Sequence, residues 1–404
     1  MTFETLKRSH LKRNIIIAVA IVFILSAIIL TFTRAKYRVT QSMPLLNGTI
    51  NYTLADINIV AMYLDGSEID TLPDGNYELT EESYCTNEEN VKDESITLSY
   101  DSATQGLLIT PMNKKGTKCY LYFEEHKPPK DVILAKEGGT AAIEAKGTPN
   151  FATVATTDMG MYAAEDDYGT SYYYRGAVND NWVQFGTNSS GQDLYWRIIR
   201  INGDGTVRLI LDEATTMDYF NDSHNNNMYE GYMYTENQVH GLDNSSAVKN
   251  VLDDWYQNNL INTTAFIEGR TGFCGDRTPY SGSGTGTTTT YYGAYNRLVT
   301  NKAPILTCTN ENDLYTTNGS GQGNEALDYP VGLITLDEVS IAGGVFDKEN
   351  NDYYLYINDV HTYSYWTMTP SYFDEDGAHV FNVYLGRPQS YWLHDADSIR
   401  PVIN

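Results

Sequence analysis

The four cysteines of this 404-residue chain offer the most constrained chemistry in the sequence. No two of Cys85, Cys119, Cys274 and Cys308 have the C-x-x-C spacing of a zinc ribbon or a thioredoxin-like redox pair. They form two pairs, each about 34 residues apart and each within one candidate domain. An even count in this arrangement predicts two structural disulfides, Cys85–Cys119 and Cys274–Cys308, in an oxidising compartment. Each would stabilise its domain by about 3–4 kcal/mol, and four unrelated buried thiols are the alternative.

The histidines and carboxylates show no spacing that is typical of a catalytic or metal site. Seven histidines are scattered along the chain without an H-E-x-x-H or H-x-H motif. No G-x-S-x-G elbow occurs, and the glycine-rich residues 281–286 lack the lysine and the helix of a phosphate-binding loop. The cluster Asp374-Glu375-Asp376 fits either a cation site or a solvated turn. We therefore predict no catalytic residue, no metal and no cofactor.

The charge balance excludes one class of partner and the aromatic composition favours another. The chain carries 27 Lys+Arg against 52 Asp+Glu, and seven of those cations lie within the first 38 residues. The remainder therefore has no basic stripe that would neutralise phosphates, so we expect no nucleic-acid binding. Tyrosine is used 33 times against 12 for phenylalanine. An amphipathic ring with few rotatable bonds is typical of surfaces that recognise a partner.

The first element along the chain is a membrane-length apolar run, Asn14–Thr33, without a charge or a proline between Ile15 and Phe32. About 20 residues of helix are needed to cross the roughly 30 Å hydrocarbon core of a bilayer. Basic residues flank the run on both sides. We predict a cytosolic tail at 1–13, a transmembrane anchor at 14–33, and everything after it outside the cell. A cleaved signal peptide is the alternative, although its apolar core is usually shorter.

Two further domains are predicted after the anchor. Residues 46–126 contain several short segments rich in β-branched and aromatic residues, separated by turn signals such as Asp65-Gly66. This pattern, with one cysteine pair and no helix signal, predicts a small all-β sandwich that acts as a stalk. Residues 127–130, with two adjacent prolines, predict a stiff linker. Residues 131–404 are long enough to bury an extensive core.

The large domain combines strand and helix signals. A hairpin is predicted from Trp196–Ile201 and Thr206–Leu211, joined by an Asn-Gly-Asp-Gly turn. A helix is predicted at about Ala247–Leu260, capped by Ser245 or Ser246, and a short one follows the capping box at Thr335–Glu338. The low-complexity residues 281–290 predict a flexible surface loop. Trp196 and Trp255 are expected in the core, and Trp392 is expected to be partly exposed.

Several segments together resemble a known family. They are Tyr174–Gly176, Trp182–Gly186, Tyr195–Gly205, Phe273–Arg277, Tyr329–Gly344, Tyr365–Pro370 and Ser398–Ile403. With the anchor and the small β domain, they are similar to a family of membrane-tethered surface proteins of gut Firmicutes. Its large domain is C-type-lectin-like, of the formylglycine-generating-enzyme-like branch. The resemblance implies an α+β lectin-like fold and a surface location, but no established chemistry.

The resemblance also implies where a ligand would bind. In related folds the residues just before the closing strand, here Ser398–Ile403, form the exposed recognition face. Carried onto this chain, that face is Ser371–Asp397, which mixes flat rings with adaptable hydrogen-bonding groups. Its candidate ligand-binding residues are Tyr372, Asp374, Asp376, His379, Tyr384, Gln389, Tyr391, Trp392, His394 and Asp395. The alternative is that alternate residues here are only the solvent side of strands.

Two classes of function remain after these exclusions. The first is a non-enzymatic, membrane-anchored receptor or adhesin whose lectin-like head binds an extracellular protein or glycan. The second is an envelope enzyme of the formylglycine-generating type, or a hydrolase. An enzyme of the formylglycine-generating type would need Cys274 and Cys308 as reactive thiols, whereas a stable disulfide between them favours the receptor.

Overall fold

The computed structural model describes residues 57–404, except residues 74, 103, 112–115, 126 and 358–363. The chain divides into two compact units, Met1–Pro128 and Pro129–Asn404. The predicted transmembrane anchor at 14–33 and cytosolic tail at 1–13 lie outside the described residues. Within the described part, no helix is both long enough and apolar enough to cross a membrane.

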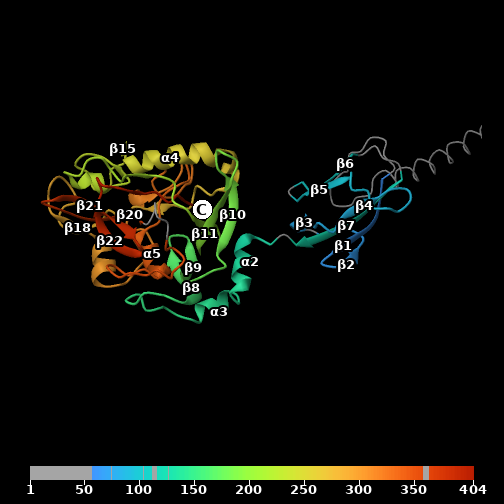
Figure 1. Cartoon of the computed structure of the whole chain (residues 1–404), viewed down its shortest axis with the longest axis horizontal. Coiled ribbons are helices and arrows are strands. Elements are labelled where there is room, and N and C mark those ends of the chain that lie inside the picture. Colours follow the sequence, from blue (N-terminus) through green and yellow to red (C-terminus); the bar gives the residue numbers. More distant parts are fainter. Residues whose placement is uncertain (1–56, 74, 103, 112–115, 126, 358–363) are drawn as a thin grey trace, which may run out of the picture. The chain divides into compact units, whose positions relative to one another are not determined.

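The described part of unit 1, residues 1–128, consists of strands without a helix (Figure 1). One sheet has the order β2-β1-β7-β3, with β1 and β7 parallel and β4 also paired to β7. A separate hairpin is formed by β5 and β6, and both share one apolar core. The strands are β1 (Ile57–Leu64), β2 (Ser67–Ile69), β3 (Tyr77–Leu79), β4 (Tyr84–Thr86), β5 (Thr97–Asp101), β6 (Gly106–Thr110) and β7 (Thr117–Glu125).

A disulfide crosses the sheet of unit 1. Cys85 in β4 lies directly opposite Cys119 in β7, and both side chains are buried in the core with Leu121 and Phe123. A two-layer unit of this size has a small core, so a crosslink inside it restricts the unfolded chain strongly. The predicted pairing Cys85–Cys119 is confirmed.

Unit 2, residues 129–404, is built around two larger sheets. The first has the order β24-β12-β11-β9-β8, with β10 paired to the other half of β11. The predicted hairpin is confirmed as β11 and β12, and the chain's closing strand β24 pairs with β12. The strands are β8 (Asp158–Asp166), β9 (Gly169–Gly176), β10 (Trp182–Thr187), β11 (Asp193–Ile201), β12 (Val207–Leu211) and β24 (Val402–Ile403).

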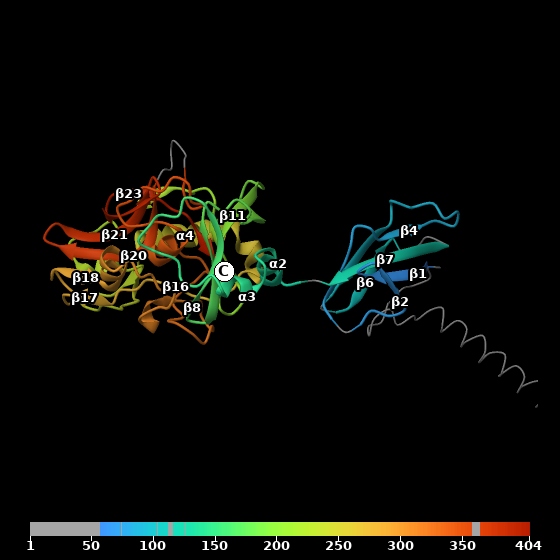
Figure 2. The same ribbon diagram turned by 90° about the horizontal axis from the view of Figure 1, so that it is seen from below.

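The second sheet of unit 2 has the order β13-β23-β20-β18-β17, with β21 between β20 and β22. Figures 1 and 2 both show β18, β20 and β21 at one end of unit 2 and β11 with α2 at the other. Its strands are β13 (Met217–Tyr219), β17 (Pro279–Ser281), β18 (Thr290–Tyr292), β20 (Ser364–Asp374), β21 (Gly377–Tyr384), β22 (Arg387–Trp392) and β23 (Ala396–Ser398). Two small ribbons complete the strands: β14 (Met233–Tyr234) with β15 (Asn244–Ser245), and β16 (Phe273–Cys274) with β19 (Leu314–Tyr315).

Both predicted helices are confirmed. Helix α4 (Ala247–Asn259) is capped by the Ser246 side chain, and α5 (Leu336–Ala342) has the complete capping box of Thr335 and Glu338. Gly343, in the left-handed region at φ 125°, ends α5. Single turns of 3-10 helix occupy Asn227–Glu230, Ile261–Phe266 and Glu311–Asp313, and a π turn occupies Tyr295–Thr300.

Two helices at the start of unit 2 were not predicted. They are α2 (Pro129–Lys136) and α3 (Thr140–Glu144). Pro129 and Lys130, expected in the stiff linker, form the first turn of α2 instead. Proline suits the first helical position because its missing N–H has no partner there in any helix. With these helices unit 2 is an α+β unit made mostly of strands.

The core of unit 2 contains Trp196 but only the edge of Trp255. Trp196 is fully buried, as predicted, and its indole N–H donates to the Phe185 carbonyl at 2.8 Å. The buried stripe of α4 follows Val248, Leu252 and Tyr256 at four-residue spacing. Trp255 therefore sits at the border of that stripe and is half-buried, which corrects the expectation of a core position.

Candidate functional site

A ladder of aromatic rings crosses four strands of the second sheet and contains several of the predicted site residues. Tyr291 lies directly opposite Tyr372, Tyr372 opposite His379, and His379 opposite Trp392. Residues directly opposite one another project from the same side of a sheet, so their rings meet. Ring centroids are 5.5 Å apart for Tyr291–Tyr372, 4.3 Å for Tyr372–His379 and 4.2 Å for His379–Trp392. We call these four residues the aromatic ladder.

Two further histidines extend the ladder beyond Trp392. His394 lies 5.4 Å from the Trp392 ring, and His224 stacks on His394 at 3.9 Å. His224 comes from a distant loop that is held against the hairpin because the Ala378 N–H donates to the His224 carbonyl. Gly377 permits this approach, since a Cβ there would lie 2.7 Å from the His224 ring. Tyr291 and His224 were missed because neither lies near the predicted segment in sequence.

The structure brings only part of the predicted set together. Tyr372, His379, Trp392 and His394 belong to the ladder and its extension, and Asp374 and Asp376 form the turn of the β20–β21 hairpin. Tyr391 lies opposite Val380 and packs against Trp366, on the other side of the sheet. The remaining three predicted residues, all half-buried and outside the ladder, are Tyr384, Gln389 and Asp395. Of all ten, only Asp376 is exposed, whereas His379 is buried, with 4% of its surface accessible.

Two members of the ladder, His379 and Tyr372, are uncharged at physiological pH. Burial lowers the pKa of His379 below its usual range, and the nearby Asp374 carboxylate acts in the opposite direction. Burial, assisted by the negative charge of Asp374, raises the pKa of Tyr372 to about 12. A neutral imidazole and a neutral phenol therefore offer flat rings with hydrogen-bonding edges rather than charge.

A buried carboxyl group lies behind the ladder. Glu230 is fully buried and accepts a hydrogen bond from the His379 backbone N–H at 3.1 Å. Burial raises its pKa well above the usual value, although Tyr292 and the His379 N–H partly offset this effect. The group therefore keeps its proton in the folded state at pH values where an exposed glutamate is ionised.

The protonated state of Glu230 makes stability depend on pH in a defined direction. Because its folded pKa is raised, the group's stabilising contribution is complete below about pH 4.5 and is lost as pH rises toward the folded pKa. Glu230→Gln lacks this loss. The free energy of unfolding of the variant minus that of wild type should therefore increase by up to about 1.4 kcal/mol per pH unit above pH 4.5. Chemical denaturation from pH 4 to pH 8 measures the difference, with exposed Glu349→Gln as control, and parallel curves would contradict the prediction.

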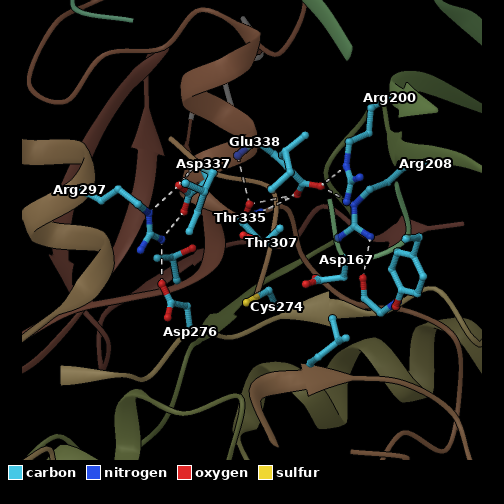
Figure 3. Close-up of a pocket in the computed structure, with 16 residues that line it drawn as sticks. Asp167, Arg200, Arg208, Cys274, Asp276, Arg297, Thr307, Thr335, Asp337 and Glu338 are labelled. Atoms are coloured by element: carbon cyan, nitrogen blue, oxygen red, sulfur yellow. Dashed lines mark hydrogen bonds and ion pairs between the residues drawn. The ribbon is translucent and has the colours of Figure 1, made fainter. Parts of the chain in front are cut away.

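A second cluster of charged residues surrounds a small cavity between α5 and the strands of the first sheet (Figure 3). Arg200 and Arg208 both bond Oε1 of Glu338, at 3.1 and 2.6 Å, and Arg297 bonds Asp337 and Asp276, each at 2.7 Å. Burial alone would raise the pKa of Glu338, but the two guanidinium groups hold it below the usual value. Every arginine at the cavity is thus already paired.

The size of this cavity decides what it can hold. Its volume is about 30 Å³, which suits a water molecule or two and no organic ligand. Cys274 lines the cavity, and its sulfur is bonded to Cys308. The predicted pairing Cys274–Cys308 is therefore confirmed. We assign this cluster a structural role, joining α5 to strands β11 and β12.

In comparisons with known proteins, no family model, curated protein or solved structure matches the chain. Among the described residues, no group of three or more histidine, cysteine, aspartate or glutamate side chains is arranged to hold a metal ion. Within the predicted face, the fold joins Tyr372, His379 and Trp392 into one row of contacting rings.

Proposed function

We propose that this chain is a cell-surface receptor or adhesin, held by a single N-terminal membrane helix, that recognises an extracellular protein or glycan. In this proposal residues 14–33 form the anchor, unit 1 is a stalk, and unit 2 is a C-type-lectin-like head of the surface-protein family that the sequence resembles. The apolar run with basic flanks supports the anchor. The two disulfides support an oxidising exterior.

The observation that carries the binding function is the aromatic ladder. Tyr372 and Trp392 are half-buried, so each ring has an accessible part while its neighbours hold it in place. Rings that are already ordered lose little conformational entropy when a partner binds. Tyrosine and tryptophan also dominate the hot spots of protein interfaces. A neutral, ordered strip of rings beside the acidic Asp374–Asp376 turn is therefore suited to recognition.

The enzyme alternative depends on the state of Cys274 and Cys308. Their disulfide beside a water-sized cavity favours a structural role for both sulfurs. Alkylation of the native chain before reduction, followed by peptide mapping, separates the two functions. An unlabelled pair supports the receptor, and rapidly labelled thiols would support an envelope enzyme of the formylglycine-generating type.

The ladder should carry the binding energy for the extracellular ligand. A glycan array and a pull-down with the full-length chain identify that ligand. We expect Trp392→Ala and Tyr372→Ala to weaken its binding by about 2 kcal/mol or more, roughly 30-fold in Kd, because both rings would lose contact area. The Tm should fall only modestly, since both side chains are only half-buried. Titration calorimetry measures the affinity.

Two variants serve as controls for this experiment. Phe266→Ala removes an exposed ring, 80% accessible, that lies outside the ladder and should leave affinity unchanged. Tyr391→Ala removes another half-buried ring and should lower the Tm by a similar amount, but it should leave affinity unchanged because that ring packs against Trp366 on the other side of the sheet. Equal binding by wild type and both ladder variants, or equal binding to residues 46–126 alone, would place the ligand elsewhere.

A further inference from the structure

A wide groove of about 670 Å³ lies at the first sheet of unit 2, away from the aromatic ladder. Its lining comes from the β10–β11 hairpin, from residues 211–215 after β12, and from the side of α4 that carries Trp255 and Asn259. The Ser189 N–H donates to the Asn259 side chain at 3.0 Å, which attaches the hairpin turn to the end of α4. Two walls of the groove are therefore joined at this point, and the groove's volume lies in the range of small-ligand sites.

Two large rings in this groove are exposed rather than packed. Trp182 in β10 is 44% accessible and Tyr195 in β11 is 51% accessible. Trp182 lies directly opposite Arg197, so Tyr195, two residues along β11, is its diagonal neighbour on the same side of the sheet. Such neighbours lie about 7–8 Å apart. The two rings therefore form adjacent platforms along one surface.

The Trp182 ring is held in position from behind. The Arg197 guanidinium lies 3.5 Å from the ring centroid, and it is itself fixed by Asp212 at 3.3 Å and by the Asn181 side chain at 2.8 Å. A ring whose orientation is set before binding loses little entropy when a ligand stacks on its open face. The guanidinium thus covers one face and leaves the other available.

The free carboxylates of the groove select against anionic ligands. Asp193 and Glu213 are exposed, and no ion pair or hydrogen bond engages either carboxylate within the described part of the chain. Free carboxylates repel anions and accept hydrogen bonds from hydroxyl groups, including two from a vicinal diol. A cation on the open face of Trp182 would meet the Arg197 charge through the ring. A ligand with many hydroxyls and weakly polarised C–H faces can donate hydrogen bonds to the carboxylates and stack on Trp182 without bringing a charge to the ring.

We propose that this groove binds an uncharged oligosaccharide, with one sugar ring stacked on Trp182 and a neighbouring ring on Tyr195. Asp193 and Glu213 accept hydrogen bonds from its hydroxyls. This site is separate from the ladder, because the ladder and strand β11 lie at opposite ends of unit 2 in both views (Figures 1 and 2). The inference does not depend on the ligand or the function proposed for the ladder.

The test uses the full-length chain in a detergent without a sugar headgroup. The probes are neutral tetrasaccharides of glucose (α- and β-linked), mannose, galactose and N-acetylglucosamine, with a galacturonate tetramer as the anionic counterpart. We expect at least one neutral probe to bind at micromolar to millimolar concentration and to change tryptophan fluorescence. The galacturonate tetramer should bind at least about tenfold more weakly than the best neutral probe, because the carboxylates of the groove repel it.

Variants then place the site. Trp182→Ala and Tyr195→Ala should each weaken binding of the best neutral probe by about tenfold or more, and Trp182→Phe, which keeps a ring over Arg197, should retain part of it. Asp193→Asn should weaken binding by a few fold. Phe266→Ala and the ladder variant Trp392→Ala should bind as wild type does. Failure of every neutral probe at about 10 mM, tighter binding of the galacturonate tetramer, unchanged affinity in Tyr195→Ala, or loss of binding in Trp392→Ala would each overturn the proposal.

Discussion

Replacing Glu338 by glutamine should lower the free energy of unfolding of unit 2 by about 3–5 kcal/mol, the cost typical of breaking a buried ion pair. Arg200 and Arg208 lie directly opposite each other in the β11–β12 hairpin, and both are buried. Two like charges in that position repel strongly unless an anion lies between them. Glu338 supplies the anion, because one of its carboxylate oxygens is ion-paired with both guanidinium groups.

The same side chain also starts helix α5. Its second oxygen accepts the Thr335 backbone N–H at 2.9 Å, while the Thr335 hydroxyl accepts from the Glu338 N–H. Glutamine keeps the shape and this cap but loses the charge, so Glu338→Gln isolates the electrostatic part. Glu338→Ala should cost more, because it removes the cap as well. Urea denaturation followed by circular dichroism measures both, and exposed Glu349→Gln is the matched control. A loss below about 1 kcal/mol in Glu338→Gln would show that the two arginines do not depend on this carboxylate.

The second large effect is expected at Trp196. Trp196→Ala should lower the free energy of unfolding by about 3–5 kcal/mol, because it opens a cavity and leaves the Phe185 carbonyl without its donor. Trp255 contacts Trp196 edge to face at 6.2 Å but is half-buried. Trp255→Ala should therefore cost only about 1–2 kcal/mol. The same denaturation experiment compares the two, and equal losses would mean that Trp255 contributes as a core residue despite its partial exposure.

Much of the local structure could be predicted from the sequence. The Asn-Gly-Asp-Gly turn, the serine before α4 and the Thr-x-x-Glu box before α5 act on backbone groups only a few residues away. Such signals do not depend on the rest of the fold, so the hairpin and both helices were placed correctly. The two disulfide pairings could be predicted because each unit contains a single pair of cysteines. Helices α2 and α3 were missed because proline was taken as a linker signal, although it also suits the first turn of a helix.

The candidate sites required the tertiary structure. The order of strands and their register bring Tyr291 and His224 to Tyr372 and Trp392, although the four residues come from three distant segments. The groove similarly brings Trp182 and Tyr195 together with helix α4, which belongs to a distant segment of the chain. Tyr391 and Trp392 look equivalent in sequence, but side chains alternate along a strand, so only one of them is in the ladder. The pairing of His379 with Trp392 decides which one, since a shift of one residue would exchange the two rings.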